Sequence, residues 1–159
     1  MILHIGVKTI DPQLVAYKKL EIGQNEADAF AKLNAEVYEK GTRPKDPTMI
    51  IYYDPKEKAV CRREIIVPID KDVEGLSTKT LPKIRAGFIV FSGTRHPVEY
   101  YYEQLRKHLE EHGLKASTET VCSIEAQYQP DQFNLSSGSF IDEDAQETWT
   151  TEILLPIEG

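Results

Sequence analysis

The chain has 159 residues, of which 40% are hydrophobic and 28% charged, a composition typical of a globular protein that can bury a core. It contains no apolar run near the roughly 20 residues of a membrane helix, and its start lacks the basic residues of a signal peptide, so a cytoplasmic protein without membrane contact is expected. The net charge of −7, without a basic block, argues against direct binding of DNA or RNA and favours a cation over an anion as ligand.

An internal repeat is indicated along the chain. Val7–Gly23 aligns without a gap with Ser77–Gly93, so that three residue types coincide: Pro12 with Pro82, Ala16 with Ala86, and Gly23 with Gly93. The two halves also end alike, on REIIVPID at Arg63–Asp70 and on TEILLPIE at Thr151–Glu158. We expect one domain, 1–159, built of a first module, 1–75, and a second module, 76–159.

The first module is predicted to run from strands into a helix and back into strands. Its helix carries apolar residues at helical spacing, with Asn25 as the N-cap and Gly41 at the C-terminal end. A strand over Thr48–Pro55 follows, and a hairpin turn at Pro55–Lys58 leads into the REIIVPID strand. The apolar residues of the helix are Ala27, Phe30, Leu33, Val37 and Tyr38.

The second module repeats this order. Pro97 suits the first turn of its helix, His96 is the expected cap, and Gly113 ends the helix. A strand over Thr120–Pro130 comes next. An acidic, Gly/Ser-bearing insert, 131–147, then reads as a loop before the last strand.

One helix per module can cover only one face of a joint sheet. We therefore expect a ligand groove between the modules on the face that the helices leave open, because such junctions often hold ligand sites. The alternative is that the duplication is purely architectural and that side chains fill the junction.

Metal and cysteine chemistry is not indicated. His108–His112, HLEEH, fits a zinc-protease motif, but it lies in the last turn of a helix and no later helix offers the further acidic ligand. Cys61 and Cys122 stand in apolar runs outside any CxxC, so reduced, buried thiols are expected. No cofactor is expected.

The sequence resembles the GyrI-like small-molecule-binding domain. This domain is the effector-binding module of multidrug regulators, and it also occurs as a stand-alone protein. The resemblance spans nearly the whole chain. It rests on IYYDP at Ile51–Pro55, CRREIIVP at Cys61–Pro68, YYYEQLRKHLEEHG at Tyr100–Gly113, CSIEAQY at Cys122–Tyr128, and TEILLPI at Thr151–Ile157. It implies an α+β fold: a duplicated β-α-β-β module, two helices on one face of a curved antiparallel sheet, and a pocket across a pseudo-twofold.

In that family a glutamate in the strand after the second helix commonly faces the pocket and meets cationic, aromatic ligands. Glu125, in SIEAQY, matches it. Gln127 stands where the family often has a tyrosine, and Tyr128 follows one residue later, which indicates either a bulge or the loss of an aromatic partner.

Strand alternation predicts which side chains of this strand line the groove. Glu125 is predicted to share the groove face with Val121, Ser123 and Gln127, while Cys122, Ile124, Ala126 and Tyr128 are predicted to face the helices. Glu152 can join Glu125 if their strands are neighbours. Its repeat partner Glu64, beside Arg62 and Arg63, is expected to be either a relic of the duplication or a salt-bridge partner. The remaining candidate ligand-binding residues are aromatic, because such rings attract cations: Tyr128, Trp149, Tyr52, Tyr53, Tyr101 and Tyr102.

The sequence thus predicts a protein that binds a small cationic, amphipathic or aromatic compound, acting with a separate regulator protein as a drug-sensing or sequestering factor. An enzyme remains the first alternative, namely a hydrolase of electrophilic compounds that uses a pocket glutamate as base. A protein-inhibitor role, like that of the gyrase-inhibitor branch of the same family, is the second. In that role the acidic stretch 142–147 would be the contact.

Overall fold

A computed structural model describes residues 1–93, 95–117, 120–128 and 150–158. Over these residues the fold is α+β with two helices and one antiparallel sheet, as predicted, and the sheet has eight strands. The predicted insert, 131–147, and Trp149 lie outside the described residues. The elements are β1 (Ile2–Ile10), β2 (Gln13–Leu20), α1 (Glu26–Glu39), β3 (Thr48–Tyr52), β4 (Arg63–Pro68), β5 (Thr78–Leu81), β6 (Ile84–Ser92), α2 (Val98–Glu111), β7 (Ser123–Tyr128) and β8 (Thr150–Pro156).

The order of the strands interleaves the two halves of the chain. The sheet reads β1-β6-β8-β7-β3-β4-β2-β5, so β3 and β7 meet at its centre. The first strand of each half lies beside the other half: β1 pairs with β6, and β5 pairs with β2. Each half is therefore strand, strand, helix, strand, strand, with one strand more than the module that the resemblance implies.

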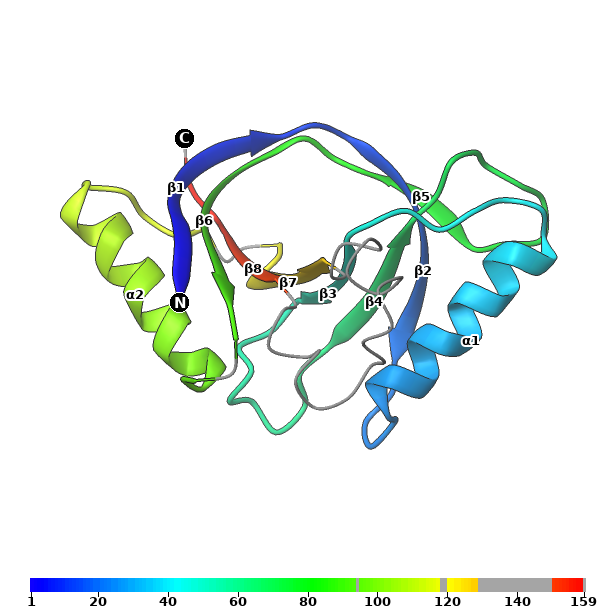
Figure 1. Cartoon of the computed structure of the whole chain (residues 1–159), viewed down its shortest axis with the longest axis horizontal. Helices are drawn as coiled ribbons and strands as arrows, with labels where there is room; N and C mark the ends of the chain where they lie inside the picture. Colours follow the sequence, from blue (N-terminus) through cyan, green and yellow to red (C-terminus); the bar gives the residue numbers. More distant parts are fainter. Residues whose placement is uncertain (94, 118–119, 129–149, 159) are drawn as a thin grey trace, which may run out of the picture.

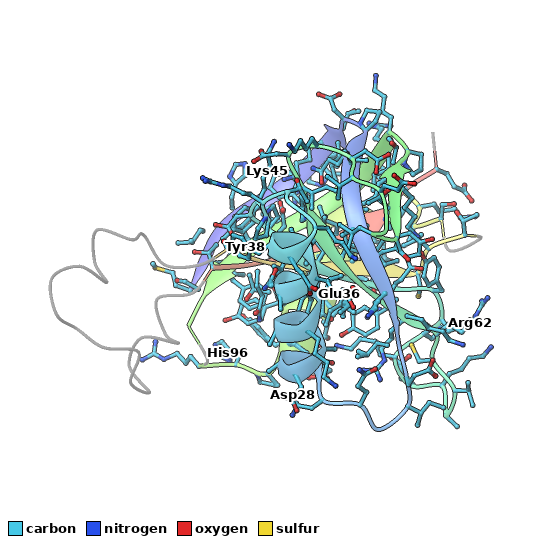
Figure 2. The ribbon with its side chains drawn as sticks, turned by 90° about the vertical axis from the view of Figure 1, so that its right-hand side faces the viewer. Asp28, Glu36, Tyr38, Lys45, Arg62 and His96 are labelled. Atoms are coloured by element: carbon cyan, nitrogen blue, oxygen red, sulfur yellow. The ribbon has the colours of Figure 1, made fainter. Side chains whose placement is uncertain are left out.

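The helices lie at the two ends of the long axis, with the curved sheet arching between them (Figure 1). Asn25 caps α1 as predicted, because its Oδ1 accepts a hydrogen bond of 3.0 Å from the backbone N–H of Asp28. Figure 2 looks onto α1, with Asp28 at its N-terminal end and Tyr38 on its exposed side.

The predicted cap of α2 is wrong. Pro97 is the N-cap, in extended conformation, and no side chain caps this helix. His96 instead stacks on the ring of Tyr100, with a distance of 4.2 Å between the ring centroids. Pro97 has a φ of −66°, which a helix would allow, but its ψ of 157° is extended, so the helix begins at Val98.

The buried residues form three clusters on two faces of the sheet. One cluster packs under α1 and includes Leu33, Ile50 and Ile65. A second packs under α2 and includes Leu105 and Ile153. The third lies on the face without helices and consists of nine buried residues: Val15, Met49, Ile51, Ile66, Ala86, Phe88, Ile124, Ala126 and Leu154. Both faces of the central strands are therefore apolar.

No described helix has the length and the hydropathy that a membrane crossing requires.

Candidate ligand-binding sites

A cavity of about 300 Å³ opens on the helix-free face, beside the third cluster. We call it the helix-free cavity. Its walls come from both halves of the chain: the turns that join β1 to β2 and β5 to β6, and the central strands β3, β7 and β8. Most of the lining is apolar, with Met49, Ile51, Ile124, Ala126 and Leu154 among its side chains. A cavity at this position matches the groove that the sequence predicts between the two halves.

Glu152, on β8, places a carboxylate at this cavity although its side chain is only 3% exposed. Its Oε2 lies 2.5 Å from the Nζ atom of Lys8, on β1, and its Oε1 accepts a hydrogen bond of 3.2 Å from the hydroxyl of Tyr128. The Lys8 ammonium also lies 4.7 Å from the centroid of the Phe88 ring. A buried carboxylate is costly unless it is paired, and here a cation and a hydroxyl supply the pairing.

Asp11, Gln13 and Thr120 are further polar side chains of the same lining. Asp11 is exposed, and Gln13 has an Oε1 atom that is buried and has no hydrogen-bond partner among the described residues. With Glu152 and Lys8 they give the lining one positive and two negative side chains. Burial and the nearby Glu152 raise the pKa of Tyr128 to about 12, so its hydroxyl stays protonated and can donate at neutral pH.

Glu125 lies on the opposite face of the sheet, the one that bears the helices. The prediction that it faces the groove on the open face is therefore wrong. It stands opposite Ile50 and Ile153, which pack under α1 and α2. Ile124, Ala126 and Tyr128 are the residues of β7 that line the helix-free cavity. The prediction assigned the more apolar set to the helix-covered core. That assignment fails because the helix-free face has an apolar core of its own.

On the helix-bearing face Glu125 is 16% exposed and holds two partners. Its Oε2 accepts hydrogen bonds of 2.7 Å from Lys56 Nζ and of 2.6 Å from the hydroxyl of Tyr102. The Lys56 ammonium lies 4.9 Å from the Tyr52 ring centroid and 5.3 Å from that of Tyr102. Burial, followed by the charge of Glu125, raises the pKa of both tyrosines well above the usual range. The result is an ammonium held by one carboxylate and two aromatic rings.

Glu64 has the same kind of partners. It accepts from Lys79 Nζ at 2.5 Å and from the Tyr53 hydroxyl at 2.7 Å, and Lys79 lies 4.3 Å from the Tyr17 ring centroid. Burial and the bond to Glu64 raise the pKa of Tyr53 above the usual range. Glu64 is an ion-pair partner, as expected, and it does not line the helix-free cavity.

The sequence did not predict the lysines that pair with Glu152, Glu125 and Glu64. Lys8, Lys56 and Lys79 meet glutamates 144, 69 and 15 residues away along the chain. No local pattern marks them, because the contacts arise only when β1 and β5 cross to the other half and the β3–β4 turn reaches β7.

The predicted aromatic residues are dispersed. Tyr128 lines the helix-free cavity, while Tyr52 and Tyr102 surround Lys56 on the other face. Tyr101 is fully buried and stacks on Phe91 with 3.6 Å between ring centroids, so it belongs to the core under α2. Trp149 lies outside the described part of the chain.

Comparison with solved structures places the fold among known proteins. The sequence matches no protein-family model and no curated protein. Among solved structures, the C-terminal domain of EcmrR is similar over 98% of this chain and 97% of its own, with a TM-score of 0.73 and 18% identity. EcmrR in a complex with DNA is also similar, with a TM-score of 0.69 and 18% identity. That match covers 98% of this chain but only 57% of the longer EcmrR chain.

SAV2435 bound to tetraphenylphosphonium is also similar, with a TM-score of 0.54 and 11% identity over 99% of this chain and 95% of that one. At these identities the likeness shows the fold. The chain therefore shares its fold with the C-terminal domain of EcmrR and with SAV2435.

Proposed function

We propose that this chain is a small-molecule-binding domain that takes an amphipathic or aromatic organic cation in the helix-free cavity. One observation carries the proposal: the Glu152 carboxylate, 3% exposed, stands at the edge of an apolar cavity of about 300 Å³ and is already bound to an ammonium group. Apolar walls would hold the body of the ligand, and Glu152 would pair with its charge.

Lys8 makes the exchange of cations feasible. Its side chain is 38% exposed, so it can leave Glu152 for water at small cost, whereas an arriving lipophilic cation would bury apolar surface as well. Phe88 and Tyr128, the neighbours of this ion pair, offer a ring face and a hydroxyl. Asp11 adds a second negative charge to the lining.

One solved structure of the same fold supports this class of ligand. SAV2435, which shares the fold, is described with tetraphenylphosphonium, a lipophilic aromatic cation. EcmrR carries a domain of this fold within a longer chain that binds DNA. By analogy we propose that ligand binding here serves sensing or sequestration together with a separate regulator protein.

Calorimetric titration with tetraphenylphosphonium tests the proposal on wild type and two glutamate variants. Glu152→Gln is expected to weaken binding at least tenfold, about 1.4 kcal/mol, because it removes the charge while it keeps the shape. Glu64→Gln is the matched control, since Glu64 also holds a lysine and a tyrosine but lies outside the cavity lining, and it should bind like wild type. Lys8→Met is expected to tighten binding, because it removes the competing ammonium.

No binding to wild type, or equal binding by wild type and Glu152→Gln, would refute this function. Equal losses in Glu152→Gln and Glu64→Gln would also count against it, because they would point to net charge rather than to the cavity. Melting temperatures of the variants show whether each is folded at the temperature of the titration.

A further inference from the structure

Three lysines of the described structure have partners of the same kind but differ in what surrounds them. Lys8, Lys56 and Lys79 each pair with a glutamate and lie over an aromatic ring. Of these three, Lys8 alone belongs to the described lining of the helix-free cavity. What distinguishes Lys8 is therefore an apolar cavity beside its amine.

The Lys8 amine can be reached from two sides. Lys8 lines the helix-free cavity and also an adjoining, more open hollow, to which His4 and Phe88 contribute. Its side chain is 38% exposed. A small molecule in the cavity can therefore lie beside the amine, while the open hollow gives water a way in and out.

Glu152 places a base against this amine. Its Oε2 lies 2.5 Å from Lys8 Nζ, and its side chain is 3% exposed. Tyr128 donates a hydrogen bond of 3.2 Å to the other oxygen, Oε1, and so holds the carboxylate with Oε2 toward the lysine. A proton can pass directly between the ammonium group and Glu152, with no solvent molecule between them.

An amine, a carboxylate and an apolar wall are what imine formation with a carbonyl compound requires. The amine attacks as the neutral group, so a base must first take a proton from the ammonium. The oxygen that leaves must receive a proton, so the same carboxyl group can act afterwards as the acid. The apolar wall holds the rest of the carbonyl compound, and Ile10, Ile84 and Leu154 supply it here.

We propose that Lys8 is a covalent capture site for aliphatic aldehydes, a further activity that does not depend on cation binding in the cavity. Glu152 takes a proton from the Lys8 ammonium, and the electron pair of the nitrogen forms a bond to the carbonyl carbon. The π electrons of the carbonyl group move to its oxygen, which takes the proton from Glu152.

Loss of water completes the capture. Glu152 removes a second proton from the nitrogen, which gives a neutral carbinolamine. It returns this proton to the hydroxyl group as the C–O bond breaks, and the electron pair of the nitrogen forms the C=N bond. One ammonium and one aldehyde become one iminium and one water, without an oxidant or a reductant. The iminium keeps the positive charge of Lys8 and stays paired with Glu152, and hydrolysis reverses the capture.

Hexanal with sodium cyanoborohydride at neutral pH tests the proposal, because the hydride reduces an iminium to a stable secondary amine. Peptide mass spectrometry of the full chain gives the labelling rate of each lysine. Lys8 is expected to react about tenfold faster than Lys79, the internal control, whose ammonium is also bound by a glutamate but lies outside the cavity lining. The ratio of the two rates should rise from propanal to hexanal, since each added methylene group buries apolar surface in the cavity.

Two variants test the roles of the amine and the carboxylate. Lys8→Arg should abolish the fast phase of labelling. Glu152→Gln is expected to slow the labelling of Lys8 about tenfold, because the amide keeps the shape but can neither take nor return the proton. Glu64→Gln is the matched control and should leave the rate at Lys8 unchanged, since Glu64 holds Lys79 instead. If Glu152→Gln does not fold, the series of aldehydes on wild type decides.

Four results would overturn the proposal: equal labelling of Lys8 and Lys79 by hexanal, the same ratio with propanal and hexanal, labelling in Glu152→Gln as fast as in wild type, or labelling of Lys8 that bound tetraphenylphosphonium does not slow. Failure of tetraphenylphosphonium to bind would refute the proposed function and leave the comparison of the two lysines intact. Binding of tetraphenylphosphonium together with equal labelling of the two lysines would refute the covalent capture alone.

Discussion

Glu64, Glu125 and Glu152 each accept a hydrogen bond from a tyrosine hydroxyl and form an ion pair with a lysine. Each of these lysines also lies within 4.9 Å of an aromatic ring centroid. The same three-residue chemistry thus recurs at separate places in the sheet. An acid in a mostly apolar protein interior needs both a charge partner and a donor, and tyrosine supplies a donor together with an apolar ring.

The contribution of Tyr128 to the stability of the fold is expected to depend on pH. Its pKa is raised to about 12, so its neutral form favours the folded state fully below the unfolded pKa of about 10, and this stability is lost as the pH rises from 10 to 12. Tyr128→Phe is expected to be about 1 kcal/mol less stable than wild type at pH 8, because the hydrogen bond to Glu152 is lost.

Urea unfolding at pH 8 to 12 checks this prediction. The difference between wild type and Tyr128→Phe should shrink above pH 10. Tyr38→Phe is the control, because Tyr38 is 63% exposed on the outer side of α1 (Figure 2), and its difference from wild type should stay near zero throughout. A gap between wild type and Tyr128→Phe that is constant with pH would contradict the assignment.

At the scale of elements, the packing of α2 on the sheet depends on a glycine. A Cβ atom at Gly87, in the middle of β6, would lie 2.6 Å from Leu109 Cδ2. Leu109 is buried on α2, so the helix approaches the strand where the strand has no side chain. The close approach fixes the position of α2, and with it that of Tyr102, which holds Glu125.

Gly87→Ala is therefore expected to lower the free energy of unfolding by about 1–3 kcal/mol, because Leu109 has little room to move. Gly6→Ala, on the neighbouring strand β1, is the matched control, since its added Cβ would stand 3.3 Å from the edge of the Phe88 ring and should cost less. In chemical denaturation, Gly87→Ala combined with Leu109→Ala should lose less than the sum of the two changes. Equal stability of Gly87→Ala and Gly6→Ala would show that α2 is not held in this way.

At the scale of the whole molecule, the two halves exchange their first strands. β1 belongs to the first half of the chain but pairs with β6, and β5 belongs to the second half but pairs with β2. Neither half can form its complete sheet alone. Glu152 and Glu125 belong to the second half, whereas the lysines that pair with them, Lys8 and Lys56, come from the first half.

We expect the separated fragments 1–75 and 76–159 to lack cooperative thermal unfolding, because each would leave one strand unpaired and its sheet edge exposed. An equimolar mixture of the fragments should regain the circular dichroism spectrum and the single unfolding transition of the intact chain. A cooperative transition in either fragment alone would show that its core suffices without the exchanged strand.

Helix α1 and the order of the elements could be predicted, because Asn25, the apolar spacing and the terminal glycine are local signals. Glu152 could be placed on a strand by its neighbours, but its burial depends on Lys8, 144 residues away. The face of the sheet on which Glu125 lies could not be predicted. Alternation fixes only which residues of β7 share a face, and buried apolar clusters lie on both faces of the sheet.

Strand β7 serves two surfaces at once, with Glu125 on one side and Ile124 and Ala126 on the other. Since side chains alternate strictly, the insertion or loss of one residue before this strand would exchange the two sets. The insertion or deletion of one codon would thus turn Glu125 toward the helix-free cavity. Such a change would alter the chemistry of both faces of the sheet at once while the strand itself is kept.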